Sequence, residues 1–485
     1  MTKRALRERV ARERYDAVVV GAGPNGLAAA ITLARAGASV LLLEASPHVG
    51  GGLRSGELTL PGFSHDLYSA VHPLGRASPF FRTLPLEEYG LRWLEPDLPL
   101  AHPRGGEQAA FLARSLDATA ASLGRDEAAY RWLMAPLVRH WDALADDILA
   151  PLLRFPGELL PLARFGLRGA PPATLVARTL FREEPARALL AGLAVHAVLP
   201  LEQPATTAFG LVLGLLAHVV GWPSPAGGAQ RLADALRCHF EALGGEILTD
   251  APVEHLGDLP EAGAVLCDVS PRQLLTLAGD ALPSRYRRAL SRYRYGAGVF
   301  KLDYALDGPV PWLAEACRRA GTVHLGGTLE EIARGERAIA AGSHPEQPFV
   351  IVAQPSLIDP ARAPAGKHTL WAYCHVPNGS SVDMTDAIEG QLERAAPGFK
   401  KLVLARRARG PGALEGENPN LIGGDIGGGV QDVLQLLSRP VLSANPYKTP
   451  LRGLYLCSSS TPPGGGVHGM CGFHAATRAL AAELA

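Results

Sequence analysis

The stretch Asp16-Ala-Val-Val-Val-Gly-Ala-Gly-Pro-Asn-Gly-Leu-Ala-Ala-Ala30 decides the fold, because an apolar strand runs directly into a glycine turn and an alanine-rich helix. In such a turn Gly21 makes the tight bend and Gly23 lets the backbone approach a pyrophosphate. Gly26, with Ala30, lets the helix pack closely on the strand. The free N–H groups at the helix start then bind phosphate oxygens. The segment therefore predicts a dinucleotide-binding strand-turn-helix unit.

The residue at the end of the next expected strand, Ala38 to Glu44, narrows the choice of dinucleotide. Glu44 lies 23 residues after Gly21, where an acidic side chain can accept hydrogen bonds from two ribose hydroxyls of an adenosine. A carboxylate at this position would repel a 2′-phosphate. FAD or NAD is therefore expected rather than NADP.

Length, charge and cysteine content exclude several classes of protein. The 485 residues suffice for two domains, and 47 basic residues balance 47 acidic ones, so nothing in the charge favours a nucleic-acid partner. The six cysteines form no CxxC pair, so neither a dithiol redox centre nor a zinc ribbon is expected, and no metal site is predicted. Without a secretory signal or an uncharged run of about 18 to 20 residues, a cytoplasmic protein is expected.

Two basic segments leave contact with a membrane surface open. Before the first strand come Lys3, Arg4, Arg7, Arg9, Arg12 and Arg14, which a solvated helix or binding to anionic lipid would explain. The apolar stretch from Leu152 to Thr179 is broken by prolines and carries Arg154, Arg164, Arg168 and Arg178. It would pack in a compact core or rest on a bilayer.

The pattern of apolar residues divides the chain into alternating segments. A short strand is expected over Glu57 to Leu60. Helices are expected over Ala110 to Leu123, Asp126 to Leu149 and Glu184 to Leu199, within a mostly helical stretch from Pro61 to about Trp222. A helix at Arg231 to Leu243 and strands at Glu246 to Thr249, Val253 to Leu256 and Gly263 to Asp268 then suggest a return to the nucleotide-binding domain.

A change of pattern after residue 299 predicts a second domain. Phe300 to Leu306, Thr322 to Leu325, Phe349 to Gln354 and His368 to Val376 alternate as strands of an antiparallel sheet, with a helix near Asp383 to Ala395. We therefore expect a nucleotide-binding domain from residues 1–75, 221–298 and 420–485, and a substrate domain from residues 76–220 and 299–419.

The tail from Gly453 to Leu480 repeats the strand, glycine turn and helix of the N-terminal motif. Glycines 464 to 466 and 469 permit close approach of a ligand to the backbone, and the helix beginning near Met470 points free N–H groups at it. The negatively charged pyrimidine edge of a reduced flavin would suit this site.

Several motifs together resemble the phytoene desaturase-like flavoproteins, a family of carotenoid desaturases, isomerases and ketolases, over nearly the whole chain. They are the turn at Gly21 to Gly26, Glu44, the loop Gly50 to Ser55, and the segments Leu60 to Asp66, Pro225 to Gln230, Asn418 to Gly424 and Pro463 to Gly472. The resemblance implies an α/β fold with a Rossmann-like FAD-binding domain of the glutathione reductase type, assembled from discontinuous segments, and an inserted α+β substrate domain. It also implies an apolar tunnel and loose attachment to membranes.

The same resemblance implies which residues hold FAD. Glu44 would contact the ribose, the Val253 backbone would lie near the adenine, and the turn at residues 466–471 would face the flavin ring. The expected cofactor-binding residues are Gly21, Gly23, Pro24, Asn25, Gly26, Glu44, Ala45, Gly51, Gly52, Leu53, Arg54, Val253, Ser459, Gly466, Val467, Met470 and Cys471.

Few polar residues are candidates for catalysis, because a bound flavin supplies the redox chemistry itself. Arg54 would neutralise a reduced flavin or make a structural contact, while His468 and His474 would act as acid or base or as hydrogen-bonding spacers. His65 and Asp66 form another pair, with a loop hydrogen-bonding role as the alternative. Cys471 is read as a packing thiol rather than a covalent flavin link.

Three functions follow. The favoured one is an FAD-dependent oxidoreductase that desaturates, isomerises or oxidises a hydrophobic, isoprenoid or carotenoid-like substrate. The alternatives are an amine oxidase-like flavoenzyme, which would need an aromatic cage although only 6% of the residues are aromatic, and a non-catalytic prenyl-binding escort protein. The oligomeric state stays open.

Overall fold

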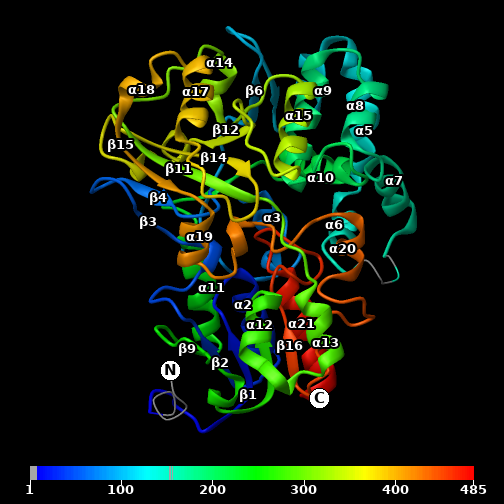
Figure 1. Ribbon diagram of the computed structural model, residues 1–485, viewed down its shortest axis with the longest axis vertical. Coiled ribbons are helices and arrows are strands. Elements are labelled where there is room, and N and C mark those ends of the chain that lie inside the picture. Colours follow the sequence, from blue (N-terminus) through cyan, green and yellow to red (C-terminus); the bar gives the residue numbers. More distant parts are fainter. Residues whose placement is uncertain (1–7, 152–154, 156, 485) are drawn as a thin grey trace.

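A parallel five-stranded sheet forms one end of the molecule in a computed structural model that describes residues 8–151, 155 and 157–484 (Figure 1). Its strands follow the order β16-β10-β1-β2-β9. Their bounds are Arg14–Val20 for β1, Val40–Leu43 for β2, Glu246–Leu248 for β9, Glu261–Cys267 for β10 and Leu454–Leu456 for β16. Three distant parts of the chain thus build one sheet, and the predicted Rossmann-like α/β fold is confirmed.

Helices cover both faces of this sheet because its central strand is apolar on both sides. Ala17 and Val19 of β1 pack with α2 (Pro24–Arg35), α11 (Gln230–Ala242) and α21 (Met470–Glu483). Val18 and Val20 point the other way, into a core with α12 (Pro271–Ala278) and α13 (Ser284–Ser291). A strand buried on both faces is the expected state of a parallel sheet.

A second sheet of seven strands lies at the other end of the molecule (Figure 1), in the order β15-β11-β14-β13-β12-β6-β7. All its pairs are antiparallel except β12 with β6. The bounds are Leu98–Pro103 for β6, Ala109–Leu112 for β7, Gly298–Leu306 for β11, Ala320–Leu325 for β12, Val350–Ala353 for β13, His368–Val376 for β14 and Val403–Arg409 for β15. The four strands expected after residue 299 are therefore present.

A layer of helices packs beside the seven-stranded sheet and shares a core with it. It consists of α4 (Leu116–Ser122), α5 (Glu127–Arg139), α6 (Trp141–Ile148), α7 (Leu159–Gly169), α8 (Ala173–Leu180), α9 (Glu184–Ala194), α10 (Thr206–Val219) and α15 (Leu329–Ala340). None of the helices in the described part of the chain is long and apolar enough to cross a membrane. Lys3, Arg4, Arg7 and Arg154 lie outside the described residues.

Smaller elements connect these layers. A hairpin of β3 (Ser55–Glu57) and β4 (Ser64–Asp66) and a two-strand ribbon of β5 (Trp93–Leu94) and β8 (Ser224–Pro225) follow the nucleotide-binding segments. The remaining helices are α3 (Pro73–Ala77), α14 (Glu315–Arg319), α16 (Pro355–Ile358), α17 (Thr385–Ala395), α18 (Phe399–Leu402), α19 (Pro411–Glu417) and α20 (Val433–Ser438).

Four expected elements were wrong in part or entirely. The helix at Ala110 to Leu123 begins as strand β7, because pairing with β6 overrides the helix propensity of alanine. The helix at Asp126 to Leu149 breaks at His140 into α5 and α6. The strand at Glu57 to Leu60 is instead β3, which ends at Glu57, and no strand forms over Val253 to Leu256.

Candidate functional site

The glycine turn after β1 closes against the end of β10. Gly21 has a φ of +97°, and a Cβ on Gly26 would lie 1.9 Å from the carbonyl oxygen of Gly21. The Gly26 N–H donates to Oδ2 of Asp268 at 2.9 Å, and burial raises the pKa of that carboxyl to about 7. The turn and the helix start are therefore packed to backbone contact, as expected for Gly21 and Gly26.

The carboxylate of Glu44 fixes the neighbouring loop. It accepts hydrogen bonds from the N–H groups of Ala22 at 2.8 Å and Ser46 at 2.9 Å, one on each oxygen. Because each carboxylate oxygen can accept more than one hydrogen bond, both keep capacity for a ligand hydroxyl. Glu44 also lines the large cavity described next.

One continuous cavity of about 1270 Å³ runs from the glycine turn into the space between the helical layer and the seven-stranded sheet. Ordinary ligand pockets measure about 300–1,000 Å³, so this one has room for a large cofactor together with a substrate. Of the expected cofactor residues, those that line it are Gly21, Gly23, Pro24, Asn25, Glu44, Ala45, Gly51, Gly52, Arg54, Val253, Ser459, Gly466 and Val467.

The other expected residues support the wall from behind. Leu53 and Met470 pack in the core beside α2, and Gly26 bonds to Asp268. The Sγ of Cys471 donates to the carbonyl oxygens of Thr461 and Gly464, each at 3.4 Å. This thiol is therefore a packing group whose sulfur is directed at the backbone, as the sequence favoured.

The two histidines near the C-terminal turn have different environments. His468 lines the cavity, but its Nδ1 accepts the N–H of Met470 at 3.0 Å at the start of α21, and burial lowers its pKa to about 4. It is a neutral helix-capping residue beside the cavity. His474 does not line the cavity, and its Nε2 donates to the carbonyl oxygen of Leu149 at 3.0 Å.

Arg54 links the glycine-rich loop from Gly50 to Ser55 to residues on the substrate side of the cavity. Its guanidinium donates to the carbonyl oxygen of Gly51 at 3.3 Å, the Tyr68 hydroxyl at 2.6 Å and the carbonyl oxygen of Glu417 at 2.9 Å. With a fourth hydrogen bond, to the Ser46 hydroxyl at 3.3 Å, the structural alternative for Arg54 is supported by four contacts, although the side chain still lines the cavity.

Lys301 is a cavity residue that the sequence analysis missed. Its Nζ donates to Oδ1 of Asp303 at 2.5 Å and to the carbonyl oxygen of Asp66 at 3.1 Å, and lies 5.3 Å from the Trp371 ring centre. Burial lowers its pKa to about 7, against the opposing effect of Asp303. The available signal was a Lys-x-Asp pair within the otherwise apolar strand Phe300 to Leu306.

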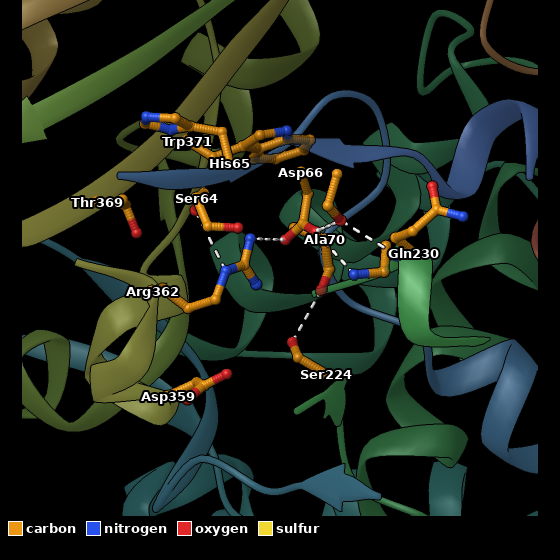
Figure 2. Close-up of polar contacts among 12 residues, drawn as sticks. Ser64, His65, Asp66, Ala70, Ser224, Gln230, Asp359, Arg362, Thr369 and Trp371 are labelled. Atoms are coloured by element: carbon orange, nitrogen blue, oxygen red, sulfur yellow. Dashed lines mark hydrogen bonds and ion pairs between the residues drawn. The ribbon is translucent and has the colours of Figure 1, made fainter. Parts of the chain in front are cut away.

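The carboxylate of Asp66 joins three parts of the chain (Figure 2). Its Oδ1 accepts from the Ser55 hydroxyl at 2.7 Å and the Ala229 N–H at 2.8 Å, while Oδ2 forms a 3.0 Å ion pair with Arg362. Both partners of the ion pair are about 1% exposed. His65 is buried beside them and its Nε2 contacts the Thr59 hydroxyl at 2.8 Å. The pair expected from the sequence thus has the loop hydrogen-bonding role.

The farther part of the cavity is mostly apolar. Its wall is formed by side chains of α7, α10 and the seven-stranded sheet, among them Phe165, Phe209, Val212, Leu213, Val299, Ile351, Trp371 and Tyr373. The rings of Trp371 and Tyr373 meet edge to face with centres 5.0 Å apart. This apolar end, called the chamber below, opens into the glycine-lined end.

Comparison with known proteins identifies the family. A model of the NAD(P)-binding Rossmann-like domain matches residues 19–84. The pyridine nucleotide-disulfide oxidoreductase domain-containing protein 2 of Rattus norvegicus is 30% identical, over 96% of this chain and 93% of the relative. The chain belongs to that protein's family. It is also 25% identical to the all-trans-zeta-carotene desaturase of Myxococcus xanthus, over 80% of this chain and 77% of the relative.

The solved structures with the same fold include putrescine oxidase bound to putrescine. It superposes with a TM-score of 0.61 at 19% identity, covering 96% of this chain and 99% of that one. Together with the relatives, this likeness identifies an oxidoreductase-type protein with the fold of flavoenzymes.

Proposed function

We propose that this protein is an FAD-dependent oxidoreductase acting on a hydrophobic, isoprenoid or carotenoid-like substrate, by desaturation, isomerisation or oxidation at a C–H or C=C group. The observation that carries the proposal is the single cavity that joins a dinucleotide cradle to an apolar chamber. The similarity to a carotene desaturase supports the same substrate class.

The cradle fits FAD in its chemistry. A Cβ on Gly23 would lie 2.8 Å from Oδ2 of Asp268, and one on Gly51 would lie 3.0 Å from the Gly23 Cα, so only glycines leave the backbone open there. Glu44 would hold the ribose hydroxyls, and Gly466 with Val467 would line the flavin side. Bound FAD would supply two-electron redox chemistry.

The residues of the chain would bind and orient the substrate and would move protons. The chamber excludes water from an apolar substrate, which its wall of aliphatic and aromatic side chains would hold by burial. Lys301 is the group best placed to hold or release a proton, since it lines the cavity and burial lowers its pKa. His468, held neutral as a helix cap, would orient the terminal turn.

Contact with a membrane surface would explain an apolar patch near the chamber. Exposed leucines of α7 and α20, namely Leu159, Leu160, Leu167, Leu434 and Leu437, are 43% to 80% exposed and form what we call the leucine rim. Phe165 of α7 and Leu436 of α20 line the cavity itself. Arg164 and Arg168 lie on α7, where they would meet anionic headgroups. We infer that lipid substrates enter here from a bilayer.

An amine oxidase-like activity is the second candidate. The edge-to-face rings of Trp371 and Tyr373 beside Lys301 provide aromatic surface in the chamber, and putrescine oxidase has the same fold.

The test is the anaerobic visible absorption spectrum of the purified protein mixed with liposomes that carry phytoene or a more unsaturated carotene. Loss of the oxidised flavin band supports the proposal. A stable band with carotenes but a bleached band with primary amines would favour the second candidate. A colourless protein would overturn both and favour the escort alternative. Replacing Glu44 by Arg should abolish cofactor retention, whereas a variant that stays fully yellow would refute the assignment of the ribose site.

A further inference from the structure

The wall of the chamber contains a small polar spot that the proposed chemistry does not use. Thr322 of β12 lines the cavity and is 3% exposed, yet among the described residues its Oγ1 has no hydrogen-bond partner. Leaving a buried hydroxyl without a partner is unfavourable. A molecule bound in the cavity would be able to complete this hydrogen bond.

His196 provides a second polar group on the same wall. It lies in the short turn Val195–Ala197 between α9 and α10 and lines the cavity. Its Nε2 lies 3.3 Å from Nε2 of His324, so these two nitrogens share one proton. Among the described residues, its Nδ1 has no partner, which leaves one imidazole nitrogen for a ligand.

The strand geometry brings these two groups together. Thr322 and His324 are two residues apart on β12, so they point to the same face, while Val323 points into the core on the other side. Their partners on β13 are Ala353 and Ile351, both of which line the cavity. Thr322 and His196 both line the cavity, and His196 contacts His324, which lies two residues from Thr322 on the same face of β12.

The two imidazole rings of this part of the wall are uncharged, and the buried His375–Glu336 pair, which also acts on the pKa of His196, does not line the cavity. Burial lowers the pKa of His196 to about 3 and that of His324 well below its usual value, so both rings are neutral. The edge of the Trp222 ring system lies against His196, with centres 6.3 Å apart and planes at 81°. The carboxylates of the cavity wall lie on the dinucleotide-binding side and on α19, and are those of Glu44, Glu254, Asp268 and Glu417.

From these observations we infer that Thr322 and His196 form a binding subsite for an uncharged oxygen function, a hydroxyl or carbonyl, on an otherwise apolar substrate. The inference rests on the proposed function and narrows its substrate class: an oxygenated isoprenoid fits the chamber better than a pure hydrocarbon. A protonated amine would meet no counter-charge there, and its burial would cost several kcal/mol.

The experiment measures binding without turnover. Quenching of intrinsic tryptophan fluorescence reports on the chamber because Trp222 and Trp371 both line it. The as-purified protein is titrated with farnesol, farnesal and farnesene, which share a C15 isoprenoid skeleton and carry a terminal hydroxyl, a terminal aldehyde and no oxygen, respectively. Two hydrogen bonds of about 1 kcal/mol each predict roughly 30-fold tighter binding of farnesol than of farnesene.

Two variants and one control isolate the subsite. Thr322→Val should reduce the farnesol preference roughly fivefold, for the loss of about 1 kcal/mol, and leave farnesene affinity unchanged. His196→Phe should do the same. Thr369→Val is the matched control, since Thr369 is also buried with an unpartnered Oγ1 but does not line the cavity. It should leave the preference as it is.

Folding is checked separately. Because Thr322 Oγ1 has no partner in the protein, Thr322→Val should melt at the same or a higher temperature than the parent. Equal affinity for farnesol and farnesene, no binding of any probe, or an unchanged preference in both variants would overturn the inference. These results are independent of flavin reduction. If the protein is yellow and its flavin is reduced but farnesol is not preferred over farnesene, only the subsite is refuted. If the protein is colourless but prefers farnesol, only the proposed redox function is refuted.

Discussion

The buried ion pair between Asp66 and Arg362 gives the sharpest prediction of stability. Replacing Asp66 by Asn keeps an acceptor for the Ser55 hydroxyl and the Ala229 N–H but leaves the guanidinium of Arg362, 1% exposed, without its counter-charge. Breaking a buried pair in this way costs about 3–5 kcal/mol. With a urea dependence of about 3 kcal/mol per molar, the unfolding midpoint should fall by about 1–1.7 M.

The pH dependence of this effect follows from the carboxyl group. Burial alone would raise the pKa of Asp66, but the charge of Arg362 and the Ala229 hydrogen bond lower it below its usual value of 3.8. The stability that the carboxylate contributes is therefore present above pH 3.8 and lost as the pH falls through the lower folded value. The difference between Asp66→Asn and the parent should shrink accordingly in acid.

Urea unfolding at pH 7, followed by circular dichroism, measures the shift. The exposed pair of Asp97 and Arg319 is the control, because Asp97→Asn should cost at most about 1 kcal/mol. In the double variant Asp66→Asn, Arg362→Met, removal of the stranded charge should restore part of the loss. A shift for Asp66→Asn no larger than that for Asp97→Asn, or a double variant as unstable as the sum of its singles, would refute the reasoning.

Three further predictions concern the cavity and its entrance. Gly26→Ala places a Cβ 1.9 Å from the Gly21 carbonyl oxygen and should abolish retention of the flavin absorbance. Gly390→Ala, in α17 with open space around it, is the control and should leave the absorbance intact. Equal retention in the two variants would contradict the close packing of the turn. The rate of flavin reduction by substrate, measured by stopped-flow absorbance, should rise with pH through about 7 as Lys301 loses its proton. Lys301→Met should flatten this pH profile. An unchanged profile in the variant would show that Lys301 takes no part in the reaction. Leu434→Ser should weaken flotation with anionic liposomes several-fold while Leu404→Ser, an exposed leucine on β15, should not; equal flotation would exclude the leucine rim as the contact surface.

Local motifs of the cradle could be predicted from sequence because their chemistry depends on neighbouring residues. A turn that needs Gly21 at positive φ, and a carboxylate at the end of the next strand, are fixed by a few consecutive positions. The strand β7 could not be predicted this way. Ala109 to Leu112 have helix propensity, and only the partner strand β6, close in sequence but unseen in the local pattern, decides otherwise.

Contacts on the substrate side of the site were even harder to predict from the sequence. Lys301 meets Asp66 across 235 residues, and Asp66 meets Arg362 across nearly 300. No periodicity links such positions, so their contacts emerge only from the packing of two sheets. Val253 illustrates a mixed result: its segment lines the cavity as expected, although the strand predicted there does not form.

The packing of α2 against α21 has a consequence for the order of events during synthesis. A Cβ on Gly472 would lie 1.8 Å from the carbonyl oxygen of Asn25, so the first and last helices of the described chain touch backbone to backbone. Contacts between such distant positions form after local ones. Until residues 454–483 have been made, the five-stranded sheet lacks its edge strand β16, and the glycine turn lacks the supporting helix α21. Binding of the proposed dinucleotide therefore requires that residues 454–483 have already been made and packed against α2.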